Sequence, residues 1–509
     1  MCQVNRDSAF LYFVYPFAFQ GENFTEHCRA IDQAPYAEKI DQEAYYDALD
    51  KIQENPRLDN KATFARKPLW EAQNFPQDDL LSYVAQYLNP TQNTPPTAHL
   101  WKLSDQVESP YDLSRHLGFK YDWDLLTPQG KRIPFGWGKE NQNQLVVQLA
   151  LFKIGVGFLT VQAQPKRNQL EDWLDFIHYF RFLQGKRGVK VQGDKRIGFS
   201  ETLQTPRSHP YFPDFAGGVI DHREGVGTLD EILFPLLETG SGEKGGCWWE
   251  EVFIPGQLLP FVGLSVQGVG EAEIPSLLYQ VRNFFHSKQG NHPSEADLEL
   301  AHPNLLPYAA RQWFVFSLDG GGFVGVDMPE TEFFQRTLIE HLRENYFLLF
   351  LLTLHQRFAL MTLSAQVAEY WLVGEQEKQR ERTFQRIRDQ LLSFTARGYF
   401  TQAMQREHHH RCYLRWQQVF QVEQFYREVS TEVQEMHEYL LQQRTKRVED
   451  RLNFLGVFIG IPGLIIGFLG INLRNITAGE DGIPLSVALL VGVVVGVVLS
   501  LLFWWRVRD

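Results

Sequence analysis

The stretches LNFLGVFIGIPGLIIGFLGINL (residues 452–473) and GIPLSVALLVGVVVGVVLSLLFWW (residues 482–505) decide the fold class of this chain. The first holds twenty-two residues without a charge and the second twenty-four. Each exceeds the roughly 20 apolar residues that a helix needs to cross a bilayer. The core of a soluble protein can contain one such helix, but two at the end of one chain are typical of a membrane protein. We therefore predict transmembrane helices at 452–473 and 484–505, joined by an external loop at 474–483.

Basic residues near the two runs predict their orientation. Four precede the first run and two lie in the tail, 506–509: Arg444, Lys446, Arg447, Arg451, Arg506 and Arg508. The loop holds one, Arg474, beside two acids. Because basic residues stay on the inner side of a membrane, we expect both termini of this multi-pass protein to be cytoplasmic.

The composition of the remaining chain indicates a large folded part inside the cell. The 509 residues are 22% charged and 14% aromatic, with a formal net charge of -12. This acidic balance gives no basic surface for nucleic acid, so we expect no direct nucleic-acid binding. The four cysteines are far apart in the sequence, which predicts neither disulfides nor structural zinc.

Residues 1–329 combine strand-like and helical patterns, which predicts an enlarged α/β or α+β cytoplasmic domain. We expect an opening strand at 8–19, paired strands at 145–152 and 157–162, and a helix at 168–183. We interpret 91–100 as a surface loop and 185–270 as irregular, glycine- and proline-rich chain.

Two glycine-rich stretches resemble nucleotide-binding motifs only in part. In GSGEKGG, 240–246, no Ser or Thr follows the lysine, so the phosphate-loop pattern fails and a loop is favoured. Gly320, Gly322 and Gly325 satisfy GxGxxG, but both flanks are strand-like. A dinucleotide site requires a helix after the glycines, so we expect a hairpin.

Helical patterns dominate from residue 330. The apolar run 346–354 is too short to cross a membrane and is expected in the core of a helical region, 330–410. The charged stretch 375–390 predicts a solvated helix. EHHHRC, 407–412, is either a transition-metal site or a polar connection between helices, and the connection is favoured because consecutive side chains point in different directions on a helix.

The most regular pattern predicts a long stalk helix at 411–451 that continues into the first span. Apolar residues recur there at steps of three or four, without glycine or proline. Within the span, five glycines at spacings of 4, 3, 4 and 3 lie on one face: Gly456, Gly460, Gly463, Gly467 and Gly470. Small residues at such spacing allow helices to approach closely.

The end of the first span carries Gly470, Ile471 and Asn472, and Asn472 lies ten residues after Pro462. Two terminal spans, a long helix leading into the first and this Gly-x-Asn signature together resemble the CorA-like family of metal ion transporters, whose own motif is Gly-Met-Asn. The resemblance implies a homopentameric, funnel-like channel in the inner membrane of a prokaryote. It also implies Mg²⁺ or another divalent cation as the permeant or regulatory ion, with Asn472 as the selectivity residue.

The same resemblance does not decide which residues of the first span line the pore. One register places Gly456, Gly460, Gly463 and Gly467 on the pore-lining face, whereas a rotated helix would present Ile461, Ile465 and Phe468. The motif departs from the family at Ile471, and no acidic residue can be assigned to a regulatory metal site. Glu480 and Asp481 in the outer loop are expected to attract cations to the mouth.

A second hypothesis starts from the size of the part that precedes the helices. In this respect the chain resembles enlarged CorA-like proteins associated with type III CRISPR systems, which implies a membrane effector opened by a nucleotide second messenger. A membrane-tethered binding module without conduction is a third alternative. No motif supports catalysis, so we expect no enzyme.

Overall fold

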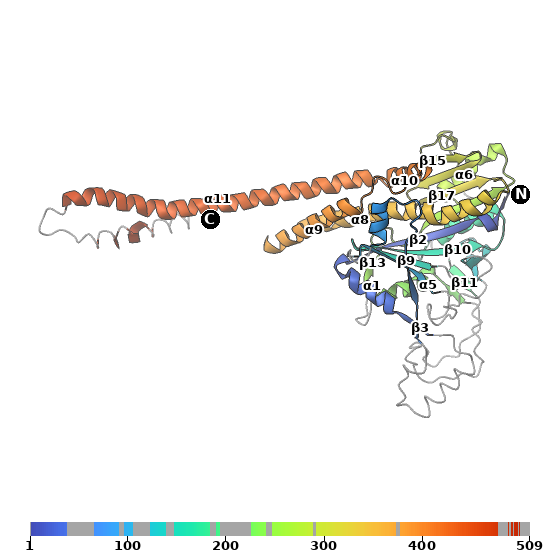
Figure 1. The fold of residues 1–509 in the computed structure, drawn as a ribbon, viewed down its shortest axis with the longest axis horizontal. Coiled ribbons are helices and arrows are strands. Elements are labelled where there is room, and N and C mark those ends of the chain that lie inside the picture. Colours follow the sequence, from blue (N-terminus) through green and yellow to red (C-terminus); the bar gives the residue numbers. More distant parts are fainter. Residues whose placement is uncertain are drawn as a thin grey trace, which may run out of the picture. The chain divides into compact units, whose positions relative to one another are not determined.

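The computed structural model gives the chain two compact units, Met1–Val373 with Arg386–Val429 and Gly374–Gln385 with Ser430–Asp509. Figure 1 shows the arrangement of elements within each unit. The structure describes residues 2–37, 66–90, 96–104, 123–138, 147–183, 190–193, 225–240, 247–288, 292–372, 377–476 and single positions between 487 and 498.

A large mixed sheet forms the centre of the first unit. Among the described residues it has 15 strands, ten of which follow the order β12-β11-β7-β8-β10-β2-β14-β17-β16-β15. Most neighbours are antiparallel, and β14 and β17 are parallel. The unit is therefore of the α+β type with a mixed sheet, one of the two predicted classes.

Five strands occupy the middle of the sheet and carry most of its apolar side chains: β2 (Phe10–Phe19), β10 (Val156–Pro165), β14 (Leu259–Gln267), β16 (Gln312–Ser317) and β17 (Gly320–Val326). The others are β1 (Gln3–Val4), β5 (Trp70–Gln73), β6 (Ala98–Leu103), β7 (Trp123–Leu126), β8 (Arg132–Trp137), β9 (Val147–Phe152), β11 (Lys190–Gly193), β12 (Gly225–Gly227), β13 (Trp249–Glu250) and β15 (Leu305–Ala309). A separate pair joins β3 (Pro35–Ala37) to β4 (Arg66–Pro68).

Strand β2 is buried on both faces, because its side chains alternate between two apolar cores. Phe13, Tyr15 and Phe17 belong to the first core, whereas Phe10 and Val14 belong to the second. The opening strand predicted at 8–19 is thus confirmed, with Ser8 in a short turn before it.

Four helices cover the first face: α1 (Phe24–Gln33), α4 (Leu170–Phe180), α5 (Leu229–Glu238) and α6 (Ile274–Arg282). The periodic apolar residues that predicted α4 place Trp173, Phe176 and Ile177 in this first core, each at most 2% exposed. The amphipathic pattern therefore holds α4 against the sheet.

Helices α3 (Ser82–Leu88), α8 (Phe347–Leu372) and α10 (Glu407–Val419) bury side chains in the second core, on the other face. A continuous helical stretch precedes α8, formed by η7 (Phe333–Thr337), α7 (Leu338–His341) and η8 (Leu342–Tyr346). Sheet and helices on either side of residue 330 thus belong to one compact unit.

One helical stretch among the described residues, Phe333–Ala368, is long and apolar enough for a membrane span by length and composition. However, 78% of its most apolar window is buried inside the protein. Its polar residues His355 and Gln356 are fully buried as well, and burial lowers the pKa of His355 to about 3. The core position predicted for the run 346–354 is therefore confirmed, although the helix continues well past His355.

Two predictions about local structure are wrong, and a third is confirmed only in part. Residues 98–100 were expected in a loop but form the start of β6, where Leu100 is buried. The segment 185–270 was expected to be irregular, yet it contains α5 and the central strand β14. Helix α9 (Glu377–Arg397) confirms the helix predicted at 375–390 and exposes charged residues such as Arg382 and Asp389, yet it also buries Phe384 and Ile387. In each case a few buried apolar residues outweigh the polar or glycine-rich composition around them.

The hairpin expected at Gly320, Gly322 and Gly325 is confirmed, since β16 and β17 are antiparallel neighbours. The glycines serve close packing between strands. Gly322 has φ +149°, and a Cβ placed there would lie 1.9 Å from the Val262 carbonyl oxygen of β14. Only glycine permits this backbone conformation at such a short approach.

We expect Gly322→Ala to lower the free energy of unfolding by about 3 kcal/mol, because the new methyl group meets backbone atoms and adds strain. Gly270→Ala is the matched control: its φ is -64° and its nearest neighbour would be a flexible carboxylate atom 3.8 Å away. That change should stay within about 0.5 kcal/mol of the wild type. Thermal unfolding in detergent measures both variants, and equal stabilities would contradict the role given to Gly322.

Candidate functional site

Helix α11 (Val422–Ile476) is a single helix of 55 residues and contains the whole first run predicted to cross the membrane. Its backbone stays helical through Pro462. Proline removes one hydrogen bond of the helix backbone, a loss that is tolerated in transmembrane helices. The second predicted run, 484–505, and the tail lie largely outside the described residues.

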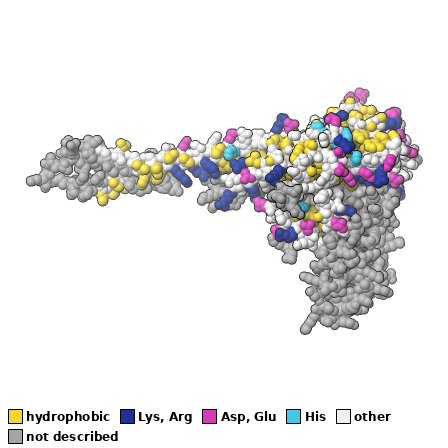
Figure 2. Space-filling model, viewed as in Figure 1, with side chains coloured by type: hydrophobic (Ala, Val, Ile, Leu, Met, Phe, Trp, Pro, Cys, Tyr) yellow, Lys and Arg dark blue, Asp and Glu magenta, His cyan; other side chains and the backbone are white. Residues whose placement is uncertain are grey.

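The apolar side chains in the described part of this run are exposed in the single chain. Leu452 is 63% exposed, Ile459 62% and Leu464 76%. Figure 2 shows the apolar side chains, in yellow, along this helix. Large contiguous apolar surfaces are unfavourable in water and mark contacts with lipid or protein. The segment therefore needs a cover that the single chain does not provide within its described part.

Four glycines on this segment leave an open helix face. A Cβ added at Gly456, Gly460, Gly463 or Gly467 would meet no described atom within 4 Å. Another helix could therefore approach the backbone closely along this face. The choice between this glycine face and Ile461, Ile465 and Phe468 as the pore lining stays a prediction.

The Gly-x-Asn signature lies at the end of α11. The backbone of Gly470, Ile471 and Asn472 is helical, and the helix continues to Ile476, past the predicted end of the span at residue 473. The side chains of these three residues, and the loop acids Glu480 and Asp481, lie outside what the structure describes. Their roles as selectivity residues and outer-mouth acids stay predictions.

The stalk helix expected from Arg411 does not begin there. Helix α10 ends at Val419 and α11 begins at Val422. Between them Gln421 adopts φ +55°, a conformation that ends a helix. Phe420 and Val422 are both fully buried, so the turn allows the chain to bury side chains on either side of it.

The histidines of EHHHRC form the beginning of α10 rather than a polar connection between helices. His409 is fully buried, and its ring centroid lies 4.4 Å from that of His408. Within the described part of the chain, no group of three or more His, Cys, Asp or Glu side chains is arranged to hold a metal ion. The structure therefore gives the metal alternative no support.

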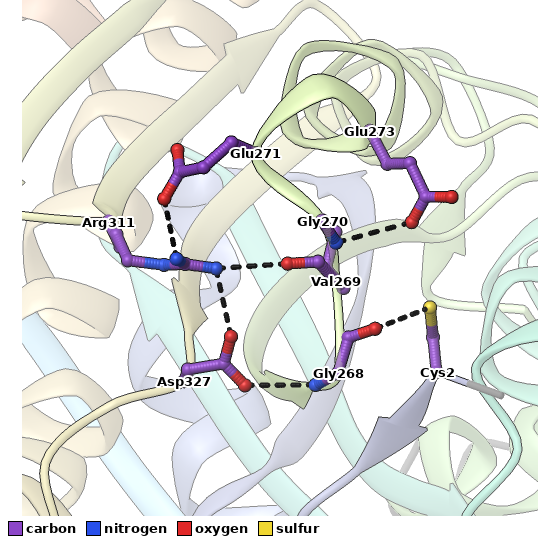
Figure 3. Close-up of polar contacts among 8 residues, drawn as sticks. All are labelled: Cys2, Gly268, Val269, Gly270, Glu271, Glu273, Arg311 and Asp327. Carbon is purple, nitrogen blue, oxygen red and sulfur yellow. Dashed lines mark hydrogen bonds and ion pairs between the residues drawn. The ribbon is translucent and has the colours of Figure 1, made fainter.

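An arginine network that the sequence did not indicate ties together the carboxyl ends of β14 and β17 (Figure 3). Arg311 donates to Glu271 at 2.5 Å, to Asp327 at 2.8 Å and to the Val269 carbonyl at 2.9 Å. Asp327 in turn accepts from the Gly268 amide at 2.9 Å. In open sheets, ligands often bind at the carboxyl ends of the strands. Here the Arg311 side chain lies at this edge and pairs with the residues that follow β14 and β17. Its partners Glu271 and Asp327 are 40 and 16 residues away, so no local motif could reveal the network.

Comparison with known families gives the C-terminal part its class. A helix with exposed apolar side chains and an open glycine face is typical of membrane proteins. Residues 350–508 match the family described as CorA-like Mg2+ transporter protein, which confirms the resemblance predicted from the signature. This part of the chain is thus similar to a family described as Mg2+ transporters. A search of curated proteins found no match.

We expect Leu464→Arg to weaken membrane insertion, because an arginine at the centre of a transmembrane helix costs about 2.5–3.5 kcal/mol. Tyr439→Arg is the control, since Tyr439 is 45% exposed on the same helix but lies before the apolar run. Carbonate extraction of membranes measures the inserted fraction. Equal extraction of Leu464→Arg and wild type would show that the exposed apolar face does not lie in lipid.

Proposed function

We propose that the protein is a channel that conducts Mg²⁺ or a related divalent cation through a pore lined by the C-terminal part of α11. The observation that carries this proposal is the coincidence of three features in one helix. Its apolar residues are exposed, its glycine face is open, and its last two turns carry Gly-x-Asn within the region that matches the CorA-like family.

A homopentamer supplies what the single chain lacks. Two helices per subunit cannot enclose a path for ions, because polar groups in the membrane must be shielded from lipid by protein. A ring of first helices would cover the exposed apolar side chains on one side, and the second helices and lipid would cover the rest. The open glycine face of α11 suits such close helix contacts.

Asn472 is proposed to select the ion at the outer mouth. Mg²⁺ loses its first-shell waters reluctantly, so a filter can act by binding the hydrated ion. A ring of amide oxygens would accept hydrogen bonds from those waters, one amide from each subunit. Glu480 and Asp481 would raise the local concentration of cations just outside this ring.

The orientation proposed for the channel places the sheet unit in the cytoplasm. Arg444, Lys446 and Arg451 precede the apolar run, and all three are exposed. Basic residues at this position favour the inner side of the inner membrane of a prokaryote. The sheet unit would then sense conditions inside the cell, and bound Mg²⁺ or another ligand there would regulate the pore.

Magnesium flux into reconstituted vesicles tests the filter. If Asn472→Ala removes about 1.4 kcal/mol of stabilisation of the bound ion, flux at low Mg²⁺ falls about tenfold. Asn475→Ala, three residues further along the same helix, is the matched control and should keep its flux. Unchanged flux in Asn472→Ala would exclude this residue as the filter, and no flux in the wild type would contradict conduction itself.

Native mass spectrometry of the detergent-solubilised chain tests the assembly. One chain has a mass of 59.1 kDa, so a pentamer has a mass on the order of 300 kDa. A closed ring leaves no interface free for further subunits, so a single particle size is expected. Gly463→Leu should reduce the pentamer fraction, since a large side chain prevents close helix contact. Leu441→Ala, outside the apolar run, serves as the control. A wild-type particle of one or two chains would contradict the proposed ring.

The second candidate function is a membrane effector opened by a nucleotide second messenger. The observation that favours it is that residues before 350, including the whole sheet, lie outside the CorA-like match. A nucleotide added to the same vesicles separates the two functions. Flux that requires the nucleotide supports the effector, whereas flux without it supports the transporter.

A further inference from the structure

His409 is a buried histidine that lacks hydrogen-bond partners. It is the third residue of α10, its side chain is fully buried, and neither ring nitrogen has a hydrogen-bond partner among the described residues. Most buried polar groups in proteins are hydrogen-bonded, and an unpaired one is costly. Such a cost is unusual in a well-packed core and calls for an explanation.

Two aromatic rings lie next to the imidazole of His409. The Tyr346 ring of η8 lies 4.7 Å from it in an edge-to-face arrangement, and the His408 ring lies 4.4 Å away. The hydroxyl of Tyr346 is also buried without a hydrogen-bond partner among the described residues. A proton on His409 would place a charge between these rings with little solvation, so the closed structure favours the neutral imidazole.

Charged and titratable groups from several elements surround this ring. The Asp79 carboxylate before α3 lies 3.9 Å from Nδ1 of His409, but Arg406 already pairs with it at 2.9 Å. Arg406, His408 and His341 of α7 oppose a positive charge on His409, and Asp79 favours it. Tyr308 contacts His408, and Cys412 lies one turn further along α10. The N-terminus of α10 itself also disfavours a cation in its first turn.

Asp79 and His409 meet where two chain segments run side by side. The segment 79–83 contacts the segment 402–406, which leads into α10. The Leu81 amide donates to the Ala403 carbonyl at 3.0 Å, and the Gln405 amide donates to the Asp79 carbonyl at 3.1 Å. Leu80 and Met404 form an isolated β-bridge, and the Tyr83 hydroxyl donates to the Gln402 carbonyl. We call this contact the 79–406 latch.

We propose that His409 is a proton-operated switch of the 79–406 latch: protonation of its buried ring favours an open form in which the beginning of α10 separates from residues 79–83. In the closed latch Arg406 satisfies Asp79 and His409 stays neutral. In the open latch the imidazole reaches water and takes up a proton. Acid therefore shifts the equilibrium toward the open form.

The sign and size of the effect follow from the two protonation states. Burial first, then His408, lowers the pKa of His409 to about 4 in the closed latch, whereas an exposed imidazole has its ordinary value of 6.5. The closed form is fully favoured above pH 6.5, and this preference is lost as the pH falls from 6.5 toward 4. Between pH 7.5 and 5, the equilibrium constant for opening should rise roughly thirtyfold.

Amide hydrogen exchange of the full chain in detergent tests the proposal. Protection factors, which correct for the intrinsic pH dependence of exchange, are compared at pH 7.5 and pH 5. Residues 402–410 and 79–83 should lose protection by roughly thirtyfold. Residues 349–354 of α8, which are all buried in the same core, serve as the internal reference and should change much less. If the protection factors of the 79–406 latch and of the reference residues fall equally in the wild type, the proposal is overturned.

A variant isolates the histidine. His409→Phe keeps an aromatic ring but cannot take up a proton, so its latch should keep the same protection at both pH values. His292→Phe, at an exposed position, is the matched control and should respond to pH as the wild type does. A pH response of His409→Phe equal to that of the wild type would overturn the proposal. Because neither measurement uses ion flux, the result is independent of the proposed channel function.

Discussion

The burial of strand β2 on both faces is the constraint on which the first unit depends. Residues 12–18 of this strand pair with β10 on one side and residues 10–14 with β14 on the other, and their side chains enter two separate cores. A shift of register by one residue would exchange the two sets of side chains. The aromatic side chains therefore fix the pairing of the sheet, and the sheet in turn fixes the helices packed on it.

Much of this arrangement could be predicted from the sequence where a single periodicity is strong. Strand β2, the β9–β10 pair, helix α4 and the β16–β17 hairpin all follow from local patterns of apolar residues. Strand β14 could not be predicted in this way, because its glycine and proline neighbours suggest irregular chain while its burial depends on β2 and β17. The turn at Gln421 was also missed, since apolar spacing continues through it and only packing on both sides requires the break.

Features of the candidate site could likewise be predicted where they depend on local sequence, but not where they depend on distant residues. Uncharged length, glycine spacing and the Gly-x-Asn signature are visible in the sequence, and the CorA-like match agrees with them. The arginine network at Arg311 and the buried ring of His409 depend on residues that are distant in the sequence, so no sequence motif predicts them. The same limit applies to any ligand of the sheet unit, whose binding residues would also come from separate segments.

The central position of β2 has a consequence for synthesis on the ribosome. This strand is synthesised well before its partners, because β10 and β14 follow about 145 and 250 residues later, and α8 later still. A strand rich in aromatic residues thus lacks its partners until β14 is synthesised, and exposed apolar chain of this kind is prone to aggregation. The nascent chain is therefore expected to need a chaperone for this strand until its partner strands have been synthesised.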